Sequence, residues 1–326
     1  MSRSIPEWLA PTSLMEALTL RASLGDEAMV LAGGTFIGIL MNQNIMQPQT
    51  LLSLRNIPEL AFIETTKGKP EASWLRIGAM TTHRAVESSS LIQQNWPILA
   101  YTFSLVASPR VRNQATVGGV LADADYASDP PAVLQALNAK VIARSVHGER
   151  EISLNELILS YYETSLRSDE LLVEVRVPGN VERAVYRKFR SRSSEDRPCV
   201  AVAAAEVEGK LRIVVGAVAE RPQYFPDICA LADAQMGDHG GTSYSQELMV
   251  KIGQCYAESI NPISDARGSA QYRRRVIAVE VRRALEEMNS VGTQSSKAFG
   301  NAAAAARATR PSERKEVFIA PISMEG

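Results

Sequence analysis

The chain has 326 residues, of which 45% are hydrophobic, so it can bury the cores of two domains. Its formal net charge is −1 at pH 7, and there is no electrostatic case for nucleic acid or an anionic membrane surface as a partner. The three cysteines and three histidines have no metal-ligand spacing, so any zinc or iron–sulfur centre must belong to another chain. The N-terminus lacks the apolar core of a signal peptide and no run approaches a membrane span, which predicts a soluble protein in a reduced, cytoplasmic setting.

A glycine doublet stands near the start of the chain, at the end of an apolar run. A helix over residues 13–23 opens with a capping box and precedes a short strand over residues 28–32. Gly33-Gly34-Thr35 comes next, before a helix over residues 37–41. Consecutive glycines can present bare amides to an anion, and a strand, a turn and a helix start in this order favour a phosphate. A tight turn without a ligand is the alternative, and the Gly-x-Gly-x-x-Gly fingerprint is absent.

Short strands and helices alternate between residues 50 and 106, which indicates an α+β fold rather than a doubly wound sheet. The expected elements are strands over residues 50–54 and 75–79, a turn over 56–60, a helix over 83–88 capped by Thr82, and a helical segment over 96–106. His83 opens the first of these helices. It is predicted to be a surface residue rather than a catalyst.

A second glycine doublet lies in Thr116-Val117-Gly118-Gly119-Val120, after a polar and irregular stretch over residues 108–114. Each of the two glycine doublets follows an apolar run and lies beside a threonine. This repetition makes it harder to explain both doublets as tight turns without a ligand. Arg110 and Arg112 could contact an anionic ligand or a partner, although solvated arginines are commoner. Asp129 precedes a proline, which favours an N-cap over a ligand contact for this residue.

The second half of the chain begins with strands and ends with helices. His147-Gly148 is typical of a hairpin turn. Three antiparallel strands then form a meander, followed by two amphipathic helices and a polar tail whose Val317–Ala320 segment could dock on a partner. The expected elements are strands over residues 140–144, 151–152, 171–177, 184–189, 199–207 and 211–219, helices over 244–259 and 271–288, and a tail over 291–326.

Six short motifs follow one another between residues 5 and 288. Any one of them alone is unspecific, but all six in the right order and spacing are hard to produce by chance. They are Ala32-Gly33-Gly34-Thr35, Leu75-Arg76-Ile77-Gly78-Ala79, Arg112-Asn113-Gln114-Ala115-Thr116-Val117-Gly118-Gly119, Ala127-Ser128-Asp129-Pro130-Pro131, Asp169-Glu170-Leu171-Leu172 and Gly268-Ser269-Ala270-Gln271-Tyr272-Arg273-Arg274. In these motifs the chain resembles the FAD-binding subunit of molybdenum-containing hydroxylases, a group that includes carbon monoxide, xanthine and nicotine-type dehydrogenases.

The resemblance implies an α+β fold with a two-part FAD-binding domain similar to the vanillyl-alcohol oxidase (PCMH) type. Its two subdomains would occupy residues 1–55 and 56–180. A C-terminal domain over residues 181–290 would hold a small three-stranded antiparallel sheet packed with helices, and residues 291–326 would form an extended tail.

The resemblance also implies where FAD binds. In the family, the two glycine loops wrap the FAD pyrophosphate with backbone amides. The aspartate that matches Asp129 makes polar contacts with FAD, which reverses the preference for a simple cap. Leu172 would lie near the flavin and Lys188 on the flavin side. The implied cofactor-binding residues are Ala32, Gly33, Gly34, Thr35, Phe36, Ile37, Thr116, Val117, Gly118, Gly119, Val120, Asp129, Leu172 and Lys188, with no metal ligand and no general acid or base. Phe36 and Val120 depart from the small or polar residue and the asparagine usual at these places. Losing that asparagine removes one hydrogen bond, worth about 1 kcal/mol, so FAD is still expected.

The function implied by the resemblance is electron transfer. Electrons would pass from the [2Fe–2S] clusters of a small partner subunit through FAD on this chain to an external acceptor, while a large molybdopterin subunit oxidises the substrate that it selects. The complex would be a heterotrimer or its dimer. One alternative is a self-sufficient flavin oxidase, but neither glycine loop carries a flavin-linking histidine, which counts against it. The other alternative is a flavin-free assembly subunit.

Overall fold

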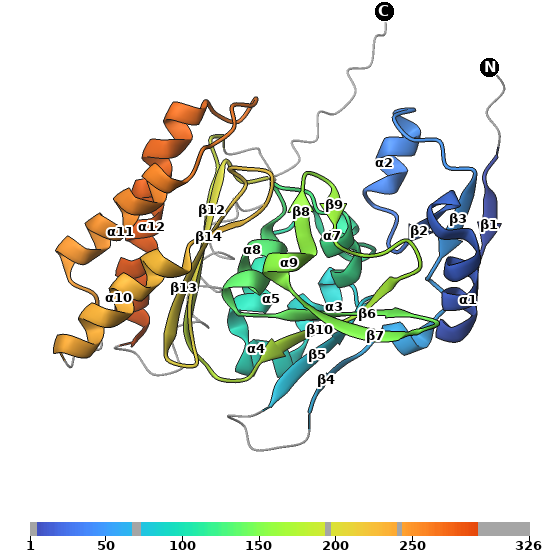
Figure 1. Cartoon of the computed structure of the whole chain (residues 1–326), viewed down its shortest axis with the longest axis horizontal. Helices are drawn as coiled ribbons and strands as arrows, with labels where there is room; N and C mark the ends of the chain where they lie inside the picture. The colour runs from blue at the N-terminus through green and yellow to red at the C-terminus, as the bar shows by residue number, and fades with distance from the viewer. Residues whose placement is uncertain (1–4, 67–72, 193–196, 240–242, 293–326) are drawn as a thin grey trace, which may run out of the picture.

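The computed structural model describes residues 5–66, 73–192, 197–239 and 243–292, and these form three main sheets, one two-stranded sheet and their helices (Figure 1). The sheets use successive parts of the chain and lie in a row, with the N-terminal sheet at one end and the C-terminal helices at the other. The α+β alternation predicted from the sequence is confirmed. Nearly all of the predicted tail, from residue 293 onward, lies outside the described residues.

The N-terminal part is a parallel three-stranded sheet of order β1-β3-β2. Its elements are β1 (Glu7–Leu9), α1 (Leu14–Leu24), η1 (Gly25–Glu27), β2 (Ala28–Leu31), α2 (Ile37–Asn42) and β3 (Thr50–Ser53). The predicted cap is present, because the Oγ of Ser13 accepts the amide of Glu16 at 3.3 Å. Helix α1 ends at Gly25, whose φ of 49° is the left-handed conformation that glycine accepts without strain.

The middle part is an antiparallel five-stranded sheet of order β4-β5-β10-β6-β7 with helices packed on it. Its strands are β4 (Ile63–Thr65), β5 (Trp74–Gly78), β6 (Lys140–Ser145), β7 (Gly148–Ser153) and β10 (Leu171–Pro178), and a small pair is formed by β8 (Ile158–Ser160) and β9 (Glu163–Thr164). Its helices are η2 (Pro58–Leu60), α3 (His83–Ser88), α4 (Ser90–Asn95), α5 (Pro97–Ser104), α6 (Pro109–Arg112), α7 (Val117–Ala122), α8 (Asp129–Ala136) and α9 (Leu154–Leu157). The hairpin at Gly148 is confirmed. The stretch expected to be irregular contains α6, because Ser108 caps it and a proline begins it.

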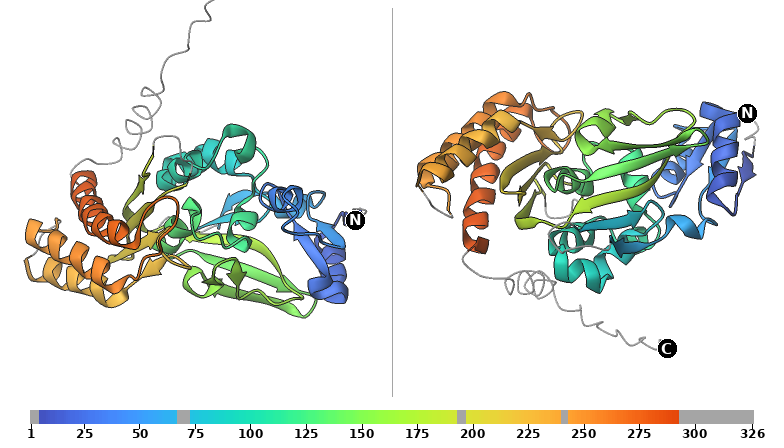
Figure 2. Two further views of the ribbon diagram at one scale, coloured as in Figure 1. Left: turned by 90° about the horizontal axis from the view of Figure 1, so that it is seen from above. Right: turned by 60° about the horizontal axis from the view of Figure 1, so that its bottom comes forward.

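The C-terminal part confirms the meander and adds to it. Its elements are β11 (Val181–Phe189), β12 (Val200–Val207), β13 (Lys210–Gly216), β14 (Gln223–Tyr224), α10 (Pro226–His239), α11 (Gln246–Ser259) and α12 (Ala270–Gly292). The sheet therefore has four strands, in the order β11-β12-β13-β14, rather than the three expected. The extra strand has two residues, too few to show an alternating pattern. Helices α10–α12 cover the outer face of this sheet (Figure 2).

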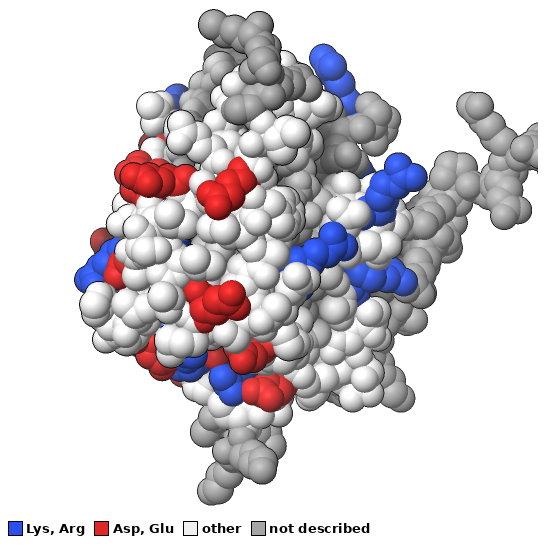
Figure 3. Space-filling model, turned by 90° about the vertical axis from the view of Figure 1, so that its right-hand side faces the viewer, with Lys and Arg blue, Asp and Glu red and all other residues white. Residues whose placement is uncertain are grey.

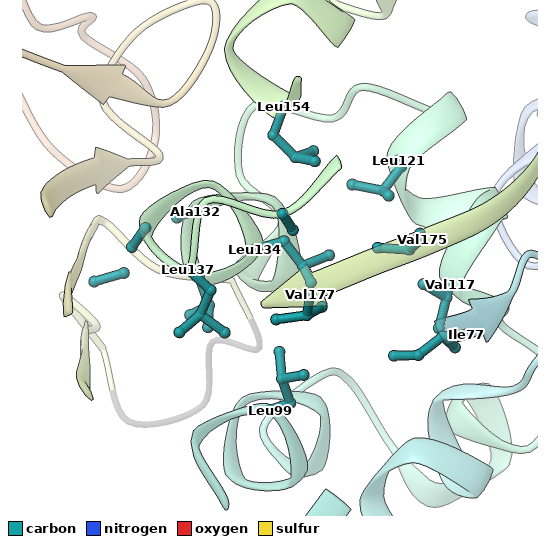
Figure 4. Packing of buried hydrophobic residues seen from close by; sticks show 14 of the residues in the cluster. Ile77, Leu99, Val117, Leu121, Ala132, Leu134, Leu137, Leu154, Val175 and Val177 are labelled. Carbon is teal, nitrogen blue, oxygen red and sulfur yellow. The ribbon is translucent and has the colours of Figure 1, made fainter. Parts of the chain in front are cut away.

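Strand β12 joins the two largest cores because both of its faces are buried. Residues Ala201, Ala203, Ala205 and Val207 belong to the core shared with α5 and α8, and residues Val200, Val202 and Ala204 belong to the core beneath α10–α12. Successive side chains of a strand point to opposite faces, so a continuous apolar run can serve two cores. Figure 4 shows the first core, where Val117, Ile77, Leu99, Leu134 and Val177 converge.

Several charged residues of the six motifs form buried or partly buried ion pairs within the scaffold. Arg76 on β5 makes two hydrogen bonds of 2.6 Å to Glu174 on β10. Glu170 accepts two hydrogen bonds from Arg150. Arg273 on α12 is fully buried and bonds Asp265 at 2.7 Å. The two-point pairings of Arg76 with Glu174 and of Arg150 with Glu170 fix the positions of the segments that carry them.

The packing of α11 on α12 generates a stability prediction. A Cβ atom at Gly253 would lie 2.4 Å from the carbonyl oxygen of Ala278, so the two helices meet at a point where no side chain fits. We expect Gly253→Ala to lower the free energy of unfolding by about 1–3 kcal/mol. Urea unfolding followed by circular dichroism measures this. The control, Gly38→Ala, adds its methyl group to open space in α2 and should raise stability by up to about 1 kcal/mol, because alanine favours a helix more than glycine does. Equal stability of the two variants would contradict the prediction.

Candidate functional site

The two glycine loops, distant in sequence, lie against each other. A Cβ atom at Gly33 would lie 2.0 Å from the carbonyl oxygen of Gln114 and 2.7 Å from its carbon. A Cβ atom at Gly119 would lie 3.6 Å from that of Ala32. The backbone of the first loop therefore touches the segment that leads into the second. The sequence shows that there are two similar motifs, and the tertiary structure brings them into contact.

The first loop presents unpaired amides. Among the described residues, the backbone N–H groups of residues 33–37 have no acceptor, although those of Gly38, Ile39 and Leu40 bond carbonyls of the loop. Gly34 has a φ of +70°, the left-handed region that its lack of a Cβ makes accessible. Successive free amides around such a residue form a concave site for an anion. This is the strongest feature in the structure for binding a phosphate group.

In the second loop the backbone amides are hydrogen-bonded within the protein, whereas the expectation was that they are free. The amides of Val117 and Gly118 donate to the carbonyls of Thr81 and Ala79, at 2.9 and 2.8 Å. The next two amides donate to the Oγ1 and the carbonyl oxygen of Thr116. A Cβ atom at Gly118 would lie 2.6 Å from that of Ala79, so this glycine is required for close packing. The second loop thus supports the site mainly by approaching its neighbours closely.

Asp129, Lys188 and Tyr186 form a buried polar cluster where α8 meets β11. Asp129 accepts hydrogen bonds from the Tyr186 hydroxyl at 2.5 Å and from the Lys188 ammonium at 2.8 Å. The ammonium also donates to the carbonyl of Leu105 at 3.1 Å. Burial raises the pKa of Asp129, and the Lys188 charge and both hydrogen bonds oppose that shift. Such a cluster holds a carboxylate and a cation in fixed positions beside each other.

The N-cap predicted for Asp129 is wrong by one residue. Ser128 occupies the N-cap position and Asp129 is the first residue of α8, with its side chain turned toward β11. The proline after Asp129 takes the second helical position. Ser128 makes no side-chain capping hydrogen bond, so the difference concerns where the helix begins.

Leu172 is buried on β10, and its strand is connected to the second loop. The pairing of β10 with β6 shifts register between Leu172 and Glu174, a bulge that changes the direction of side chains. The carbonyl of Val173 accepts the amide of Ala79, and the carbonyl of Ala79 accepts the amide of Gly118. Leu172, the apolar residue that the resemblance implies near a flavin, therefore lies on the strand that supports the second glycine loop.

The prediction of a surface position for His83 is wrong. Its side chain is 1% exposed, with Nε2 lying 3.2 Å from the carbonyl oxygen of Thr116 and the ring edge-on to Phe103. His83 and Val86, three residues apart, face the core together, and this spacing was the available signal. Arg112 is also buried rather than solvated. It bonds Glu87 and the carbonyls at 106 and 107, so it holds the turn before the second loop.

A further group of residues, missed by sequence reasoning, surrounds the loop between α7 and α8. Asp125 is buried and forms an ion pair with Arg197. Burial and the nearby Asp125 raise the pKa of Asp123 to about 7. Tyr126 donates a hydrogen bond to Asp265 at 3.0 Å and accepts one from Arg267. These contacts join the middle part to the C-terminal part, and only the fold could bring them together.

The described residues contain no group of three or more His, Cys, Asp and Glu side chains that could hold a metal ion. No helix in this part of the chain is both long and apolar enough to cross a membrane. On the face in Figure 3, acidic side chains lie on the left with some basic ones among them, further basic side chains lie on the right, and neither sign covers the face. The free backbone amides of the first loop and the buried polar cluster around Asp129 are features that suit an organic cofactor.

Family comparisons cover both halves of the chain. Residues 3–180 match the family described as the FAD binding domain in molybdopterin dehydrogenase. Residues 184–288 match the CO dehydrogenase flavoprotein C-terminal domain. These two segments together span all three sheets.

Individual proteins are similar over nearly the whole chain. The 6-hydroxypseudooxynicotine dehydrogenase complex subunit alpha of Paenarthrobacter nicotinovorans is 33% identical over 289 residues, covering 86% of this chain and 93% of that protein. The carbon monoxide dehydrogenase medium chain of Hydrogenophaga pseudoflava is 29% identical over 284 residues, covering 86% and 95%. A solved Cu,Mo-CO dehydrogenase chain has a TM-score of 0.79 at 28% identity, covering 89% of this chain and 99% of that chain. Quinoline 2-oxidoreductase from Pseudomonas putida 86 has a TM-score of 0.78 at 26% identity, covering 90% and 100%.

The burial of His83 predicts a pH dependence. Burial lowers its pKa to about 4 from 6.5, so the unfolded state binds a proton that the folded state does not. The contribution of neutral His83 to the free energy of unfolding is then fully present above pH 6.5, and it is lost as the pH drops toward 4. Between about pH 7.5 and pH 5 the loss due to this residue is about 2 kcal/mol. We expect His83→Gln to reduce the pH dependence of urea unfolding by that amount. An unchanged pH profile would count against the prediction.

Proposed function

Because the chain belongs to the family of FAD-binding subunits of molybdopterin dehydrogenases, we propose that it carries electrons from iron–sulfur clusters of a partner subunit, through FAD, to an external acceptor. The observation that carries this proposal is the run of unpaired amides over residues 33–37. Bound FAD supplies the redox chemistry, since a flavin exchanges one or two electrons. The chain itself binds and orients the cofactor.

The first glycine loop would hold the FAD diphosphate. Its amides are free and Gly34 has positive φ, which fits a doubly anionic group that lies close to bare backbone. Gly33 could not be replaced by a larger residue without separating the loop from Gln114. Residues 116–120 would complete this end of the site as the supporting wall. The residues present therefore fit the group that the family binds.

The buried cluster around Asp129 would orient the rest of the cofactor. Lys188 provides a cation whose position is fixed by Asp129 and by the carbonyl of Leu105. A fixed positive charge beside a flavin favours its more negative, reduced forms and so affects the reduction potential. Leu172 would supply an apolar contact. Tyr186 would keep the carboxylate of Asp129 in place through its hydroxyl.

The proposed partners follow from the complexes for which the relatives are named. Relatives are named as medium chains or as subunits of dehydrogenase complexes. We propose a large molybdopterin subunit and a small iron–sulfur subunit, in a heterotrimer or its dimer in the cytoplasm. In this arrangement the large subunit selects and oxidises the substrate, and the FAD subunit only receives and delivers electrons.

The function is tested by purifying the chain with whatever binds it. We expect two partner chains, molybdenum and iron in the complex, and visible flavin absorption that belongs to this chain. The isolated subunit should then fail to oxidise substrates of the complex. A yellow protein that is active alone would instead indicate a self-sufficient oxidase, and a colourless chain in the complex would indicate an assembly subunit.

The glycine loop is tested by Gly33→Ala. Its methyl group would lie 2.0 Å from a carbonyl oxygen of the neighbouring backbone, so the loop must move. We expect FAD affinity in the intact complex to fall by about tenfold or more, which corresponds to about 1.4 kcal/mol. Fluorescence titration of the deflavinated complex measures it. Gly38→Ala, in open space four residues after Gly34, should bind FAD normally. Equal affinity of both variants would refute the proposed role of the loop.

A further inference from the structure

Phe36, which departs from the residue usual after Gly-Gly-Thr, has an aromatic partner. Its ring stacks on Tyr162, with centroids 5.7 Å apart and planes 12° from parallel. Tyr162 belongs to the turn between β8 and β9, so the pair connects the N-terminal part to the middle part. Aromatic pairs stabilise each other at centroid separations of about 4.5–7 Å. Phe36 is also the fourth of the five residues, 33–37, whose amides are free.

Tyr162 is held firmly from the other side. Its amide donates to the carbonyl of Ala124 at 3.1 Å, and its hydroxyl is hydrogen-bonded with Arg197. Arg197 pairs with Asp125, whose other carboxylate oxygen accepts the amide of Ala127 at 3.1 Å. The tyrosine is thus anchored to the loop between α7 and α8. That loop leads from the second glycine doublet to Asp129.

Backbone strain is concentrated at the same place. Ala124, Tyr162 and Ala217 all have positive φ, at 46°, 59° and 64°, a conformation that side chains with a Cβ rarely adopt. The three are connected, because Tyr162 bonds the carbonyl of Ala124 and the amide of Ala217 donates to the carbonyl of Tyr126. Such strain persists only where the surrounding contacts require it. The contacts around Tyr162 therefore hold its backbone in place.

We propose that Phe36 and Tyr162 form a clasp, a pair of positioning residues that holds the first glycine loop over the FAD diphosphate. The inference rests on the proposed function. Gly33 fixes the start of the loop against Gln114, and the stack fixes its end against the middle part. With both ends held, the five amides are arranged before the diphosphate arrives. A loop ordered in advance binds its ligand more tightly because less ordering accompanies binding.

The test measures which part of the cofactor depends on the clasp. In the deflavinated complex, Phe36→Ala should weaken FAD and ADP binding by about three- to tenfold, the range of an aromatic pair. ADP carries the diphosphate without the flavin. Riboflavin carries the flavin without any phosphate, and its affinity should stay unchanged. Phe36→Tyr should restore FAD affinity, because it keeps the ring. A general loss of folding would weaken ADP and riboflavin binding alike.

A double-mutant cycle decides whether the pair acts as one unit. Tyr162→Ala should have the same effect as Phe36→Ala, and the double variant should be no worse than either single variant. The matched control is Tyr272→Ala, an aromatic residue of similar exposure that pairs with Phe189 instead. It should bind FAD normally. Additive effects, or normal ADP binding by Phe36→Ala, would overturn the clasp. If the unaltered complex bound no FAD, the proposed function itself would be overturned.

Discussion

Gly33 lies so close to the carbonyl of Gln114 that no side chain fits between them, and this contact between two backbones determines the geometry of the candidate site. It places the free amides of the first loop beside the second glycine doublet. The second doublet is in turn tied to the middle sheet through Ala79 and Val173. The first loop, on a small three-stranded sheet, thereby takes its position from the larger middle part of the molecule.

The C-terminal part contributes to the site as much as the two parts before it. Tyr186 and Lys188 are on β11, and both reach Asp129 on α8. Strand β12 buries one face in the core of the middle part and the other beneath α10–α12. The polar cluster is consequently held on a sheet that cannot shift without opening two cores. This rigidity suits a role in which the protein orients a cofactor and the cofactor supplies the chemistry.

The motifs that reveal the family are largely structural. Arg76, Arg112 and Arg273 belong to three different motifs, and each is engaged by carboxylates or carbonyls of the scaffold. An unpaired charge in such places would be costly, so these residue types are fixed by their partners. Motif order in the sequence therefore identified the scaffold, and with it the family. The free amides of the first loop, on which the proposed function rests, cannot be read from residue types at all.

The sequence by itself determined the α+β order, the hairpin, the meander and the two glycine doublets, because these depend on local periodicity, turn residues and caps. The tertiary structure decided which loop has free amides, since the acceptors at Thr81 and Ala79 are distant in the chain. It also buried His83 and turned Asp129 from a cap toward β11. Local rules describe a residue's neighbours in sequence, whereas burial and pairing depend on neighbours that only the folded chain provides.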